Sequence, residues 1–326
     1  MKIAVLGAGA WGTSLARLLH ENRHTVTLWG HDAAHLADMQ AAGRNDRYLP
    51  GIDLPLALKL EADLQAAAND QDVIVVAVPS KAFREVTRSL QKFSGLVVSV
   101  TKGIEYESVL TMGGVAQANA PSARVAALSG PSLAMEVARG IPAAVVAASQ
   151  TLATARQVQE LFHRPAFRVY TSTDMLGVEL GGALKNVIAI AAGVGDGLGF
   201  GDNSKAALVT RGIAEMRRRG VACGAQAETF SGLSGLGDLT VTCFSRLSRN
   251  RSFGELLGRG RNISDILAST VTVAEGYPTA RAAFQLAGRL KIATPIINEV
   301  HAMLYEGKDV AQAVRDLTMR DSKAED

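Results

Sequence analysis

The distribution of apolar and polar residues divides the chain into two parts with different periodicity. In the first part, continuous apolar runs recur, as in strands that are buried on both faces of a parallel sheet. These runs occupy residues 2–6, 25–29, 72–79, 95–103, 124–132, 142–149 and 167–172. Amphipathic segments such as 13–20 separate them. The pattern predicts an α/β domain with a mostly parallel sheet over residues 1–172.

Beyond residue 172 the apolar spacing becomes that of helices, and no further β-rich run occurs. Two glycine-rich segments, 193–204 and 232–243, interrupt the helical pattern and are predicted to be loops. We therefore expect an all-helical domain over residues 173–326. A sheet domain joined to a helical domain also predicts a cleft between the two.

The stretch "GAGAWG" follows the first predicted strand and precedes the first predicted helix. Gly7, Gly9 and Gly12 form the pattern GxGxxG in the context that dinucleotide binding requires. The first glycine permits a tight turn, the second lets the backbone approach a pyrophosphate, and the third allows close packing of helix on strand. The pyrophosphate would then meet the amide groups of a helix N-terminus. The sequence thus predicts a Rossmann-type domain.

Ligands of such sheets bind at the carboxyl ends of the strands. Pro79, Ser80, Thr101 and Lys102 follow two of the predicted strands and are expected to face the cleft. After the strand that begins at residue 124 comes a glycine turn, where Ser132 is expected to cap a helix.

Lys185 stands at the centre of a predicted helix of small and apolar residues, 179–193. Its neighbours on the same helix face carry no acidic group: Gly181, Gly182, Ile188 and Ala189. The residues alone allow two interpretations. The lysine extends its ammonium to water along an apolar surface, or it is held in a cleft as a proton donor.

Composition and charge limit the classes of partner. The chain has 326 residues, of which 48% are hydrophobic, so it can bury two cores. A net charge of +3 does not indicate nucleic-acid binding without a concentrated basic patch. The run Arg217, Arg218 and Arg219 is interpreted as a solvated helix face or end.

Cysteine usage and the apolar segments predict a cytoplasmic protein. Cys223 and Cys243 form neither a CxxC pair nor a zinc spacing, which favours a reduced protein without a metal site. The N-terminal apolar run is shorter than the ~7–15 residues of a signal peptide, and glycines interrupt it. Lys185 and Asp196 break up the longest apolar segment, so we expect no membrane span.

Several long motifs occur in a fixed order: "GAGAWGTSLA", "SGPSLAMEV", "ELGGALKNVIAIAAGVGDGLGFGDNSKAAL", "GLSGLGDLTVTCFSRLSRN" and "VAEGYPTA". Because of these motifs and their order, the chain resembles the bacterial-type NAD(P)-dependent glycerol-3-phosphate dehydrogenases along nearly its whole length. The resemblance implies reversible hydride transfer between NAD(P)H and dihydroxyacetone phosphate. The product would be sn-glycerol 3-phosphate for phospholipid synthesis.

The resemblance also implies roles for individual residues. Lys185 would be the catalytic proton donor and acceptor, with Asp238 orienting it or the substrate hydroxyls. The substrate would contact Lys102, Gly130, Ser132, Lys185, Asp238, Ser248, Arg249 and Asn250. The cofactor, NAD or NADP, would contact Gly7, Gly9, Ala10, Trp11, Gly12, His31, Lys102, Ala134, Arg249, Val273 and Glu275.

These roles agree with simple chemistry. Hydride addition to a ketone places negative charge on oxygen, which a lysine can stabilise and protonate. Burial would lower the lysine pKa toward neutrality, and Asp238 would oppose that shift if it lay too close. Arg249 offers a planar fork of donors for a phosphate, with Ser248 and Asn250 beside it.

The chain departs from the family pattern at Ala10, Leu133 and His31, where serine, phenylalanine and arginine are frequent. Backbone amides bind most of the phosphate, so the first two changes look tolerable. His31 replaces a charge that would favour a 2′-phosphate, and Asp32 could accept hydrogen bonds from ribose. We expect both cofactors to work, with less preference for NADPH than in relatives that carry the arginine.

Other interpretations are a β-hydroxyacid or 6-phosphogluconate-type dehydrogenase, and a protein that senses NAD(P)H without turnover. The first leaves "GLSGLGDL" and "SRN" unexplained, and in the second Lys185 would be replaceable. Nucleic-acid binding ranks third. A homodimer is compatible with the sequence, which specifies neither the oligomeric state nor regulation by product or lipid metabolites.

Overall fold

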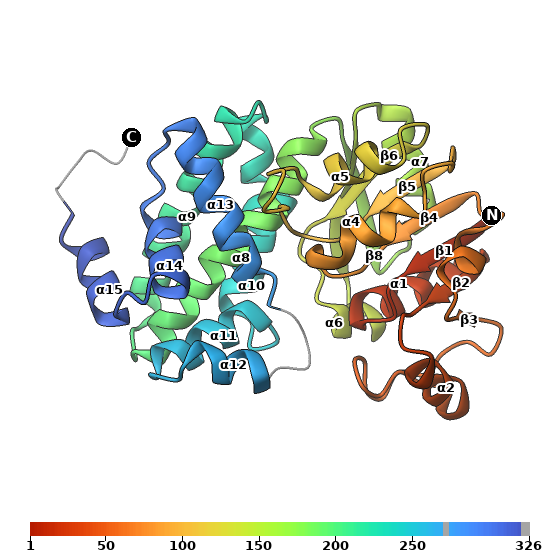
Figure 1. Cartoon of the computed structure of the whole chain (residues 1–326), viewed down its shortest axis with the longest axis horizontal. Helices are drawn as coiled ribbons and strands as arrows, with labels where there is room; N and C mark the ends of the chain where they lie inside the picture. Colours follow the sequence, from red (N-terminus) through yellow and green to blue (C-terminus); the bar gives the residue numbers. More distant parts are fainter. Residues whose placement is uncertain (270–273, 321–326) are drawn as a thin grey trace.

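The computed structural model describes residues 1–269 and 274–320. Figure 1 shows two parts side by side: a sheet with its helices at the right, and a cluster of helices at the left. The N-terminus lies on the sheet part, and the last described helix, α15 (Val310–Thr318), lies on the far side of the helical part. The long helix α8 (Met175–Gly197) follows directly on the last strand and runs through the helical part.

The sheet has eight strands in the order β3-β2-β1-β4-β5-β6-β7-β8, and only β6 and β7 pair antiparallel. The predicted mostly parallel sheet is therefore confirmed, and its first six strands have the order of a doubly wound dinucleotide-binding sheet. The short strand β3 was missed because it contains only the partly exposed KLE and no apolar run. The strands are β1 (Lys2–Leu6), β2 (Thr25–Trp29), β3 (Lys59–Glu61), β4 (Val73–Val76), β5 (Leu96–Ser99), β6 (Arg124–Ser129), β7 (Ala143–Ser149) and β8 (Phe167–Ser172).

Helices cover both faces of the sheet, which explains why the central strands β1, β4 and β5 are apolar at nearly every position. In β4, Val73 and Val75 pack into the core under α1, whereas Ile74 and Val76 pack into the core under α4 and α5. The helices of this part are α1 (Ala10–Glu21), α2 (Ala33–Ala42), α3 (Leu64–Ala68), α4 (Ser80–Arg88), α5 (Met112–Asn119), α6 (Ala134–Ala138) and α7 (Leu152–Phe162).

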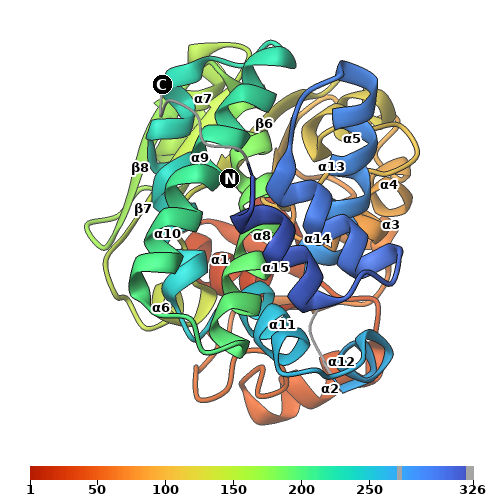
Figure 2. The ribbon, with the colours of Figure 1, turned by 90° about the vertical axis from the view of Figure 1, so that its left-hand side faces the viewer.

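The second part is helical, as predicted, and no strand follows Ser172 in the described part of the chain. Figure 2 shows α8 in the middle of this part, with the other helices around it. They are α9 (Asp202–Ala222), α10 (Asp238–Phe244), α11 (Arg249–Gly258), α12 (Ile263–Ser269), α13 (Gly276–Leu290), α14 (Pro295–Tyr305) and α15 (Val310–Thr318). A 3₁₀ turn (Ala227–Ser231) precedes a π-helical turn (Leu233–Gly237).

The prediction of a loop over 232–243 is wrong, because this segment forms the π-helical turn and α10. Its glycines serve close packing rather than chain reversal. A Cβ at Gly235 would lie 2.1 Å from the carbonyl oxygen of Phe230, so only glycine fits there. The prediction for 193–204 holds only for its middle, since α8 continues to Gly197 and α9 begins at Asp202.

We expected no segment long and apolar enough to span a membrane, but α8 meets both criteria. It has 23 residues and contains an 18-residue window with a mean hydropathy of 1.4. However, 83% of its apolar window is buried inside the protein. It packs against α9, α10, α11 and α13, and its Lys185 forms an ion pair with Asp238 of α10. These contacts are those of the central helix of a protein core.

The interpretation of Arg217 to Arg219 as a solvated face is wrong at one position. Arg217 and Arg218 are exposed on α9, but the side chain of Arg219 is fully buried. None of its guanidinium nitrogens has a hydrogen-bond partner among the described residues. Burial lowers the pKa of Arg219 to about 10. This part of the core therefore contains a guanidinium that lost its water without gaining a hydrogen bond, and the attraction of the buried Glu215 on the same helix only partly offsets its burial.

We predict that Arg219→Met stabilises the protein. An unsatisfied buried polar group costs roughly 1–3 kcal/mol, and methionine fills a long, narrow space without polar atoms. Urea denaturation should show a free energy of unfolding higher by about that amount.

The matched control is Arg217→Met on the exposed face of the same helix, which should change stability by less than about 0.5 kcal/mol. A loss of stability in Arg219→Met would show that the guanidinium is stabilising where it stands.

Candidate functional site

The turn between β1 and α1 has the geometry that the glycine pattern predicts. Gly7 adopts φ +126°, and a Cβ at Gly12 would lie 1.8 Å from the carbonyl oxygen of Gly7. Gly9 is the N-cap of α1, no side chain caps this end, and no acidic residue lies in the first turn. The amide groups at the start of α1 are thus available to an anion, which fits the pyrophosphate of a dinucleotide.

Asn45 holds this turn in place and was missed from the sequence. Its side chain is fully buried and donates to the carbonyl oxygen of Ala8 at 2.9 Å and to Thr13 Oγ1 at 2.7 Å. Sequence periodicity gives no signal for such a residue, because it comes from the connection after α2. Trp11 packs near Phe167, and the Ala134 carbonyl accepts a hydrogen bond from Ser14 of α1.

Two lysines from different parts of the fold meet on one carboxylate. Lys102 follows β5, Lys185 comes from α8, and Asp238 is the first residue of α10. Asp238 Oδ2 lies 2.6 Å from Lys102 Nζ, and Oδ1 lies 3.0 Å from Lys185 Nζ. Lys185 and Asp238 are 6% and 2% exposed. The interpretation of Lys185 as a snorkelling surface lysine is therefore wrong.

The β6–α6 turn completes this cluster. The carbonyl oxygen of Gly130 accepts hydrogen bonds from Lys102 Nζ and from Ser132 Oγ, each at 2.9 Å. Ser132 therefore does not cap α6 as expected, since Leu133 is the N-cap and makes no side-chain bond. Its hydroxyl instead shares the carbonyl oxygen of Gly130 with the Lys102 ammonium. The structure thus brings five predicted substrate residues together: Lys102, Gly130, Ser132, Lys185 and Asp238.

Burial controls the protonation of Lys185. It lowers the pKa of this ammonium to about 8, an effect that Asp238 opposes and the charge of Lys102 reinforces. Burial by itself would raise the pKa of Asp238, but its two ammonium neighbours outweigh that effect and lower it. With all groups charged, the cluster has a net charge of +1, which suits an anionic ligand or transition state.

Thr242 belongs to this cluster and, like Asn45 at the glycine turn, was missed from the sequence. Lys185 Nζ donates to Thr242 Oγ1 at 2.7 Å, and Oγ1 in turn donates to the carbonyl oxygen of Asp238 at 2.5 Å. The four-residue spacing of Asp238 and Thr242 on one helix could have revealed it, had residues 238–243 been assigned to a helix. Thr242 fixes the position of the Lys185 ammonium.

The start of α11 adjoins this cluster. Ser248 is the N-cap of α11, and its hydroxyl accepts from the amide of Arg251. Asn250 donates to Asn186 Oδ1 and accepts from the amide of Gly276, each at 2.8 Å, so it joins three helices. Arg249 between them is exposed and makes no ion pair among the described residues. Of the three, Arg249 has the side chain free to bind a ligand.

Glu275 lies where the helical part meets the sheet part. Its Oε1 accepts from the amide of Ser80 at 3.0 Å, and its Oε2 accepts from the hydroxyl of Ser80 at 2.5 Å. Both carboxylate oxygens of Glu275, which was expected to contact the cofactor, are therefore bonded to Ser80, the first residue of α4. Pro79 and Ser80 lie at this junction, as predicted. Val273, another expected cofactor residue, lies outside the described residues.

The residues after β2 differ from the expectation for Asp32. His31 is exposed, but Asp32 is the N-cap of α2 and accepts from the amide of His35 at 3.0 Å. Its other oxygen lies 3.2 Å from Arg47 Nη1, and the Arg47 guanidinium lies over the ring of Tyr48. Asp32 is thus engaged within the protein, and sequence reasoning missed Arg47, whose cation lies beside Asp32.

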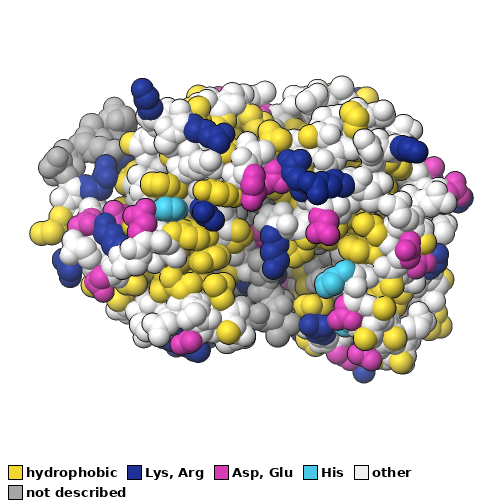
Figure 3. All heavy atoms as spheres, viewed as in Figure 1, with side chains coloured by type: hydrophobic (Ala, Val, Ile, Leu, Met, Phe, Trp, Pro, Cys, Tyr) yellow, Lys and Arg dark blue, Asp and Glu magenta, His cyan; other side chains and the backbone are white. Residues whose placement is uncertain are grey.

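Figure 3 shows a hollow between the sheet part and the helical part, next to a group of charged side chains. The glycine turn at the start of α1 has the geometry to bind the pyrophosphate of a dinucleotide, and the Lys102–Asp238–Lys185 cluster has the charges to stabilise and protonate a developing oxyanion. No group of three metal-ligating side chains occurs within residues 1–269 and 274–320.

Comparison with known proteins agrees with this geometry. Residues 2–155 match the N-terminal model of NAD-dependent glycerol-3-phosphate dehydrogenase, and residues 174–315 match its C-terminal model. Glycerol-3-phosphate dehydrogenase [NAD(P)+] of Chlorobium luteolum is 49% identical over 100% of this chain and 99% of its own length. The protein of that name from Chlorobium phaeobacteroides is 47% identical, with the same coverage.

A solved structure of glycerol-3-phosphate dehydrogenase from Coxiella burnetii superimposes with a TM-score of 0.94 at 40% identity. The match covers 98% of this chain and 99% of that one. D-mandelate dehydrogenase has a TM-score of 0.61 at 12% identity, which shows a shared fold alone. These full-length matches agree with the glycine turn and the lysine-carboxylate cluster, and they show that the chain belongs to the NAD-dependent glycerol-3-phosphate dehydrogenase family.

Proposed function

We propose that this chain is an oxidoreductase that reduces dihydroxyacetone phosphate reversibly to sn-glycerol 3-phosphate with NADH or NADPH. The observation that carries the proposal is the buried Lys185 ammonium, held by Asp238 and Thr242 beside Lys102. In its family this activity serves phospholipid synthesis. The direct test is oxidation of NADH by the purified protein with dihydroxyacetone phosphate, followed at the nicotinamide absorbance.

The residues of the cluster divide the chemistry among them. Bound NAD(P)H supplies the hydride that adds to the carbonyl carbon of the substrate. Lys185 donates its proton to the oxygen, so that the ketone becomes an alcohol and Lys185 becomes a neutral amine. Lys102 keeps a positive charge near that oxygen. In the reverse direction the neutral Lys185 amine accepts the hydroxyl proton.

Asp238 and Thr242 position Lys185 and set its proton affinity. Asp238 raises the pKa of Lys185 against the larger effect of burial, and without it two ammonium groups would repel each other in the same space. Thr242 accepts a hydrogen bond from Lys185 Nζ and thereby fixes the orientation of the ammonium and of its remaining N–H groups. A group with a pKa near 8 can both donate and accept a proton close to neutral pH.

We further propose that residues 1–172 and 173–326 are the two domains, since the last strand ends at Ser172 and α8 begins at Met175. Residues Gly130, Ser132, Ser248, Arg249 and Asn250 would hold the substrate. A cytoplasmic location and a homodimer stay predictions, which fractionation and sedimentation would test.

The pH dependence should follow the Lys185 pKa of about 8. Reduction needs the ammonium, so kcat/KM for dihydroxyacetone phosphate should fall about tenfold per pH unit above that value. Oxidation of sn-glycerol 3-phosphate needs the amine, so its kcat/KM should rise with pH and level off above it. Lys185→Ala should lose about 10²–10⁴-fold in both directions.

Asp238→Asn provides the control for this assignment. Because Asp238 raises the lysine pKa, its removal should shift both profiles to lower pH. Profiles that are flat between pH 6.5 and 9.5, or that persist in Lys185→Ala, would rule out Lys185 as the proton donor.

Arg249→Ala should weaken use of the phosphate substrate. A hydrogen bond to a charged group contributes roughly 1.5–3 kcal/mol, so kcat/KM should fall about ten- to hundredfold. Arg249→Lys should recover only part of the loss, because it keeps the charge without the planar fork. Dihydroxyacetone, which lacks the phosphate, should be a poor substrate, and Arg249→Ala should hardly change its kcat/KM. If kcat/KM falls equally for both substrates, Arg249 serves the fold or the cofactor instead.

Cofactor preference should respond to two residues near the end of β2. His31→Arg should raise the ratio of kcat/KM for NADPH to that for NADH, because it adds a charge for a 2′-phosphate. Arg47→Gln should lower this ratio, since it removes the cation that the structure places beside Asp32. If neither variant changes the ratio by more than twofold, the ribose binds elsewhere.

A further inference from the structure

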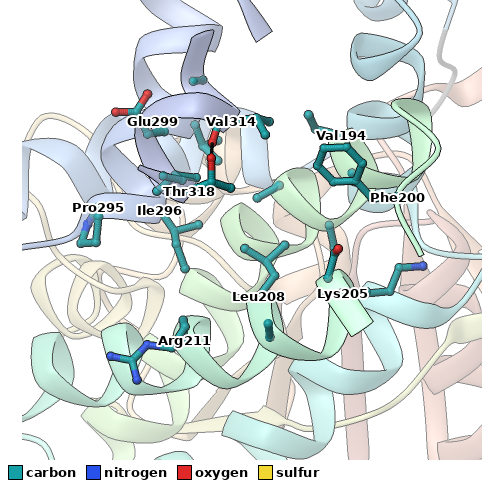
Figure 4. A pocket seen from close by; sticks show the side chains of 18 of the residues that line it. Val194, Phe200, Lys205, Leu208, Arg211, Pro295, Ile296, Glu299, Val314 and Thr318 are labelled. Atoms are coloured by element: carbon teal, nitrogen blue, oxygen red, sulfur yellow. Dashed lines mark hydrogen bonds between the residues drawn. The ribbon is translucent and has the colours of Figure 1, made fainter. Parts of the chain in front are cut away.

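A cavity of about 480 Å³ lies in the helical part. Figure 4 shows it between the side chains of α9 on one side and those of α14 and α15 on the other. Its floor is the last part of α8, from Ala191 to Asp196. These residues follow Lys185 by six to eleven positions, which is about 9–16 Å along the helix. The Lys102–Asp238–Lys185 cluster does not line the cavity.

The walls of the cavity are apolar. In Figure 4, Leu208, Ile296 and Val314 lie toward its middle, whereas the charged ends of Arg211 and Glu299 lie toward its margin. Phe200 closes one end and is 45% exposed, which is unusual for a phenylalanine in a core. A space of this size and lining is typical of sites that bury an aliphatic or aromatic ligand.

The acidic side chains of the cavity are already satisfied. Asp196 forms ion pairs with Lys205 and Arg251, each at 2.6 Å, and Glu299 forms one with Lys308 at 2.5 Å. Glu215 is buried and accepts from the backbone amides of Ile296 and Ile297, each at 3.0 Å. None of the three carboxylates is left to bind a cationic ligand.

The arginines of the cavity are not satisfied in the same way. Arg211 and Arg320 have no carboxylate partner among the described residues, and Arg218 makes only a 3.4 Å contact with the carbonyl oxygen of Ala293. Arg211 and Arg218 lie on the same face of α9, two turns or about 10.5 Å apart. The margin of the apolar cavity is therefore cationic.

We propose that this cavity binds a straight-chain aliphatic carboxylate. The chain would lie between Leu208, Ile296 and Val314, and the carboxylate would accept hydrogen bonds from Arg211 at the margin. The guanidinium fork matches a carboxylate in geometry and in charge. This site is separate from the proposed catalytic cleft, and the inference does not depend on the reaction proposed there.

Isothermal titration calorimetry of the full-length protein with hexanoate, octanoate and decanoate tests the proposal. A buried methylene contributes enough to lower Kd about fourfold, so each step of two carbons should tighten binding about tenfold or more. Decanol and decyltrimethylammonium should bind at least tenfold more weakly than decanoate. Equal affinities across the chain-length series, or equal affinities for the three head groups, would overturn the proposal.

Two variants and one matched control locate the site. Leu208→Trp should abolish decanoate binding by filling the cavity, and Arg211→Gln should weaken it about tenfold. Arg217→Gln removes an exposed arginine of the same helix outside the cavity and should leave Kd unchanged. If Leu208→Trp unfolds the protein, the comparison of Arg211→Gln with Arg217→Gln decides. Equal Kd values for these two variants overturn the proposal.

Competition separates this site from the cleft. The Kd of decanoate should stay the same when NADH and sn-glycerol 3-phosphate are both saturating, whereas displacement by them would place the carboxylate at Arg249 and overturn the proposal. Sedimentation tests the other occupant, a second copy of the chain. If the chain is a dimer that Leu208→Trp dissociates, and decanoate does not bind to that dimer, the cavity is covered by the second copy. This result would also overturn the proposal.

Discussion

The contact of Asp238 with two ammonium groups is the interaction on which the rest of the site depends. Inside the protein, a single ammonium without a partner would lose its proton, and two of them would repel each other. Asp238 lies 3.0 Å from Lys185 Nζ and 2.6 Å from Lys102 Nζ, so it allows both charges to stay in one small volume. Burial still lowers the pKa of Lys185 to about 8. The balance of these two effects gives Lys185 a proton affinity suited to donating a proton near neutral pH.

This contact requires that three elements approach α8 very closely, and small residues make that approach feasible. A Cβ at Gly181 would lie 2.7 Å from the carbonyl oxygen of Ser234, just before α10. A Cβ at Gly193 would lie 2.0 Å from that of Arg251 in α11, and one at Gly276 in α13 would lie 2.5 Å from that of Asn186. The glycine-rich composition of this region thus determines which side chains can reach Lys185.

The sequence was sufficient for features that depend on local pattern. The strands, the glycine turn and the change to helices at residue 172 follow from periodicity, because each strand or helix must bury its own apolar face. Features that depend on contacts between distant segments were missed. Asn45, Thr242 and the pairing of Asp32 with Arg47 leave no periodic signal, and the burial of Arg219 contradicts the usual behaviour of a basic run. The glycines of 232–243 indicated turns because their spacing cannot distinguish a turn from a close contact.

Two carboxylates attach the helical part to the sheet part. Glu275 accepts from the amide of Ser80 at the start of α4, and Glu179 of α8 accepts from the amide of Gly113 in the first turn of α5. Both bonds use the positive end of a helix, where a carboxylate is most stable. Burial nevertheless raises the pKa of Glu179 to about 7, so its carboxylate is fully charged only above neutral pH.

The helices α4 and α5 follow β4 and β5 at the carboxyl edge of the sheet, which is where dinucleotides bind in such folds. The carboxylates therefore place Lys185 relative to the carboxyl edge of the sheet through directional hydrogen bonds, which fix a position more sharply than apolar packing between the two parts would.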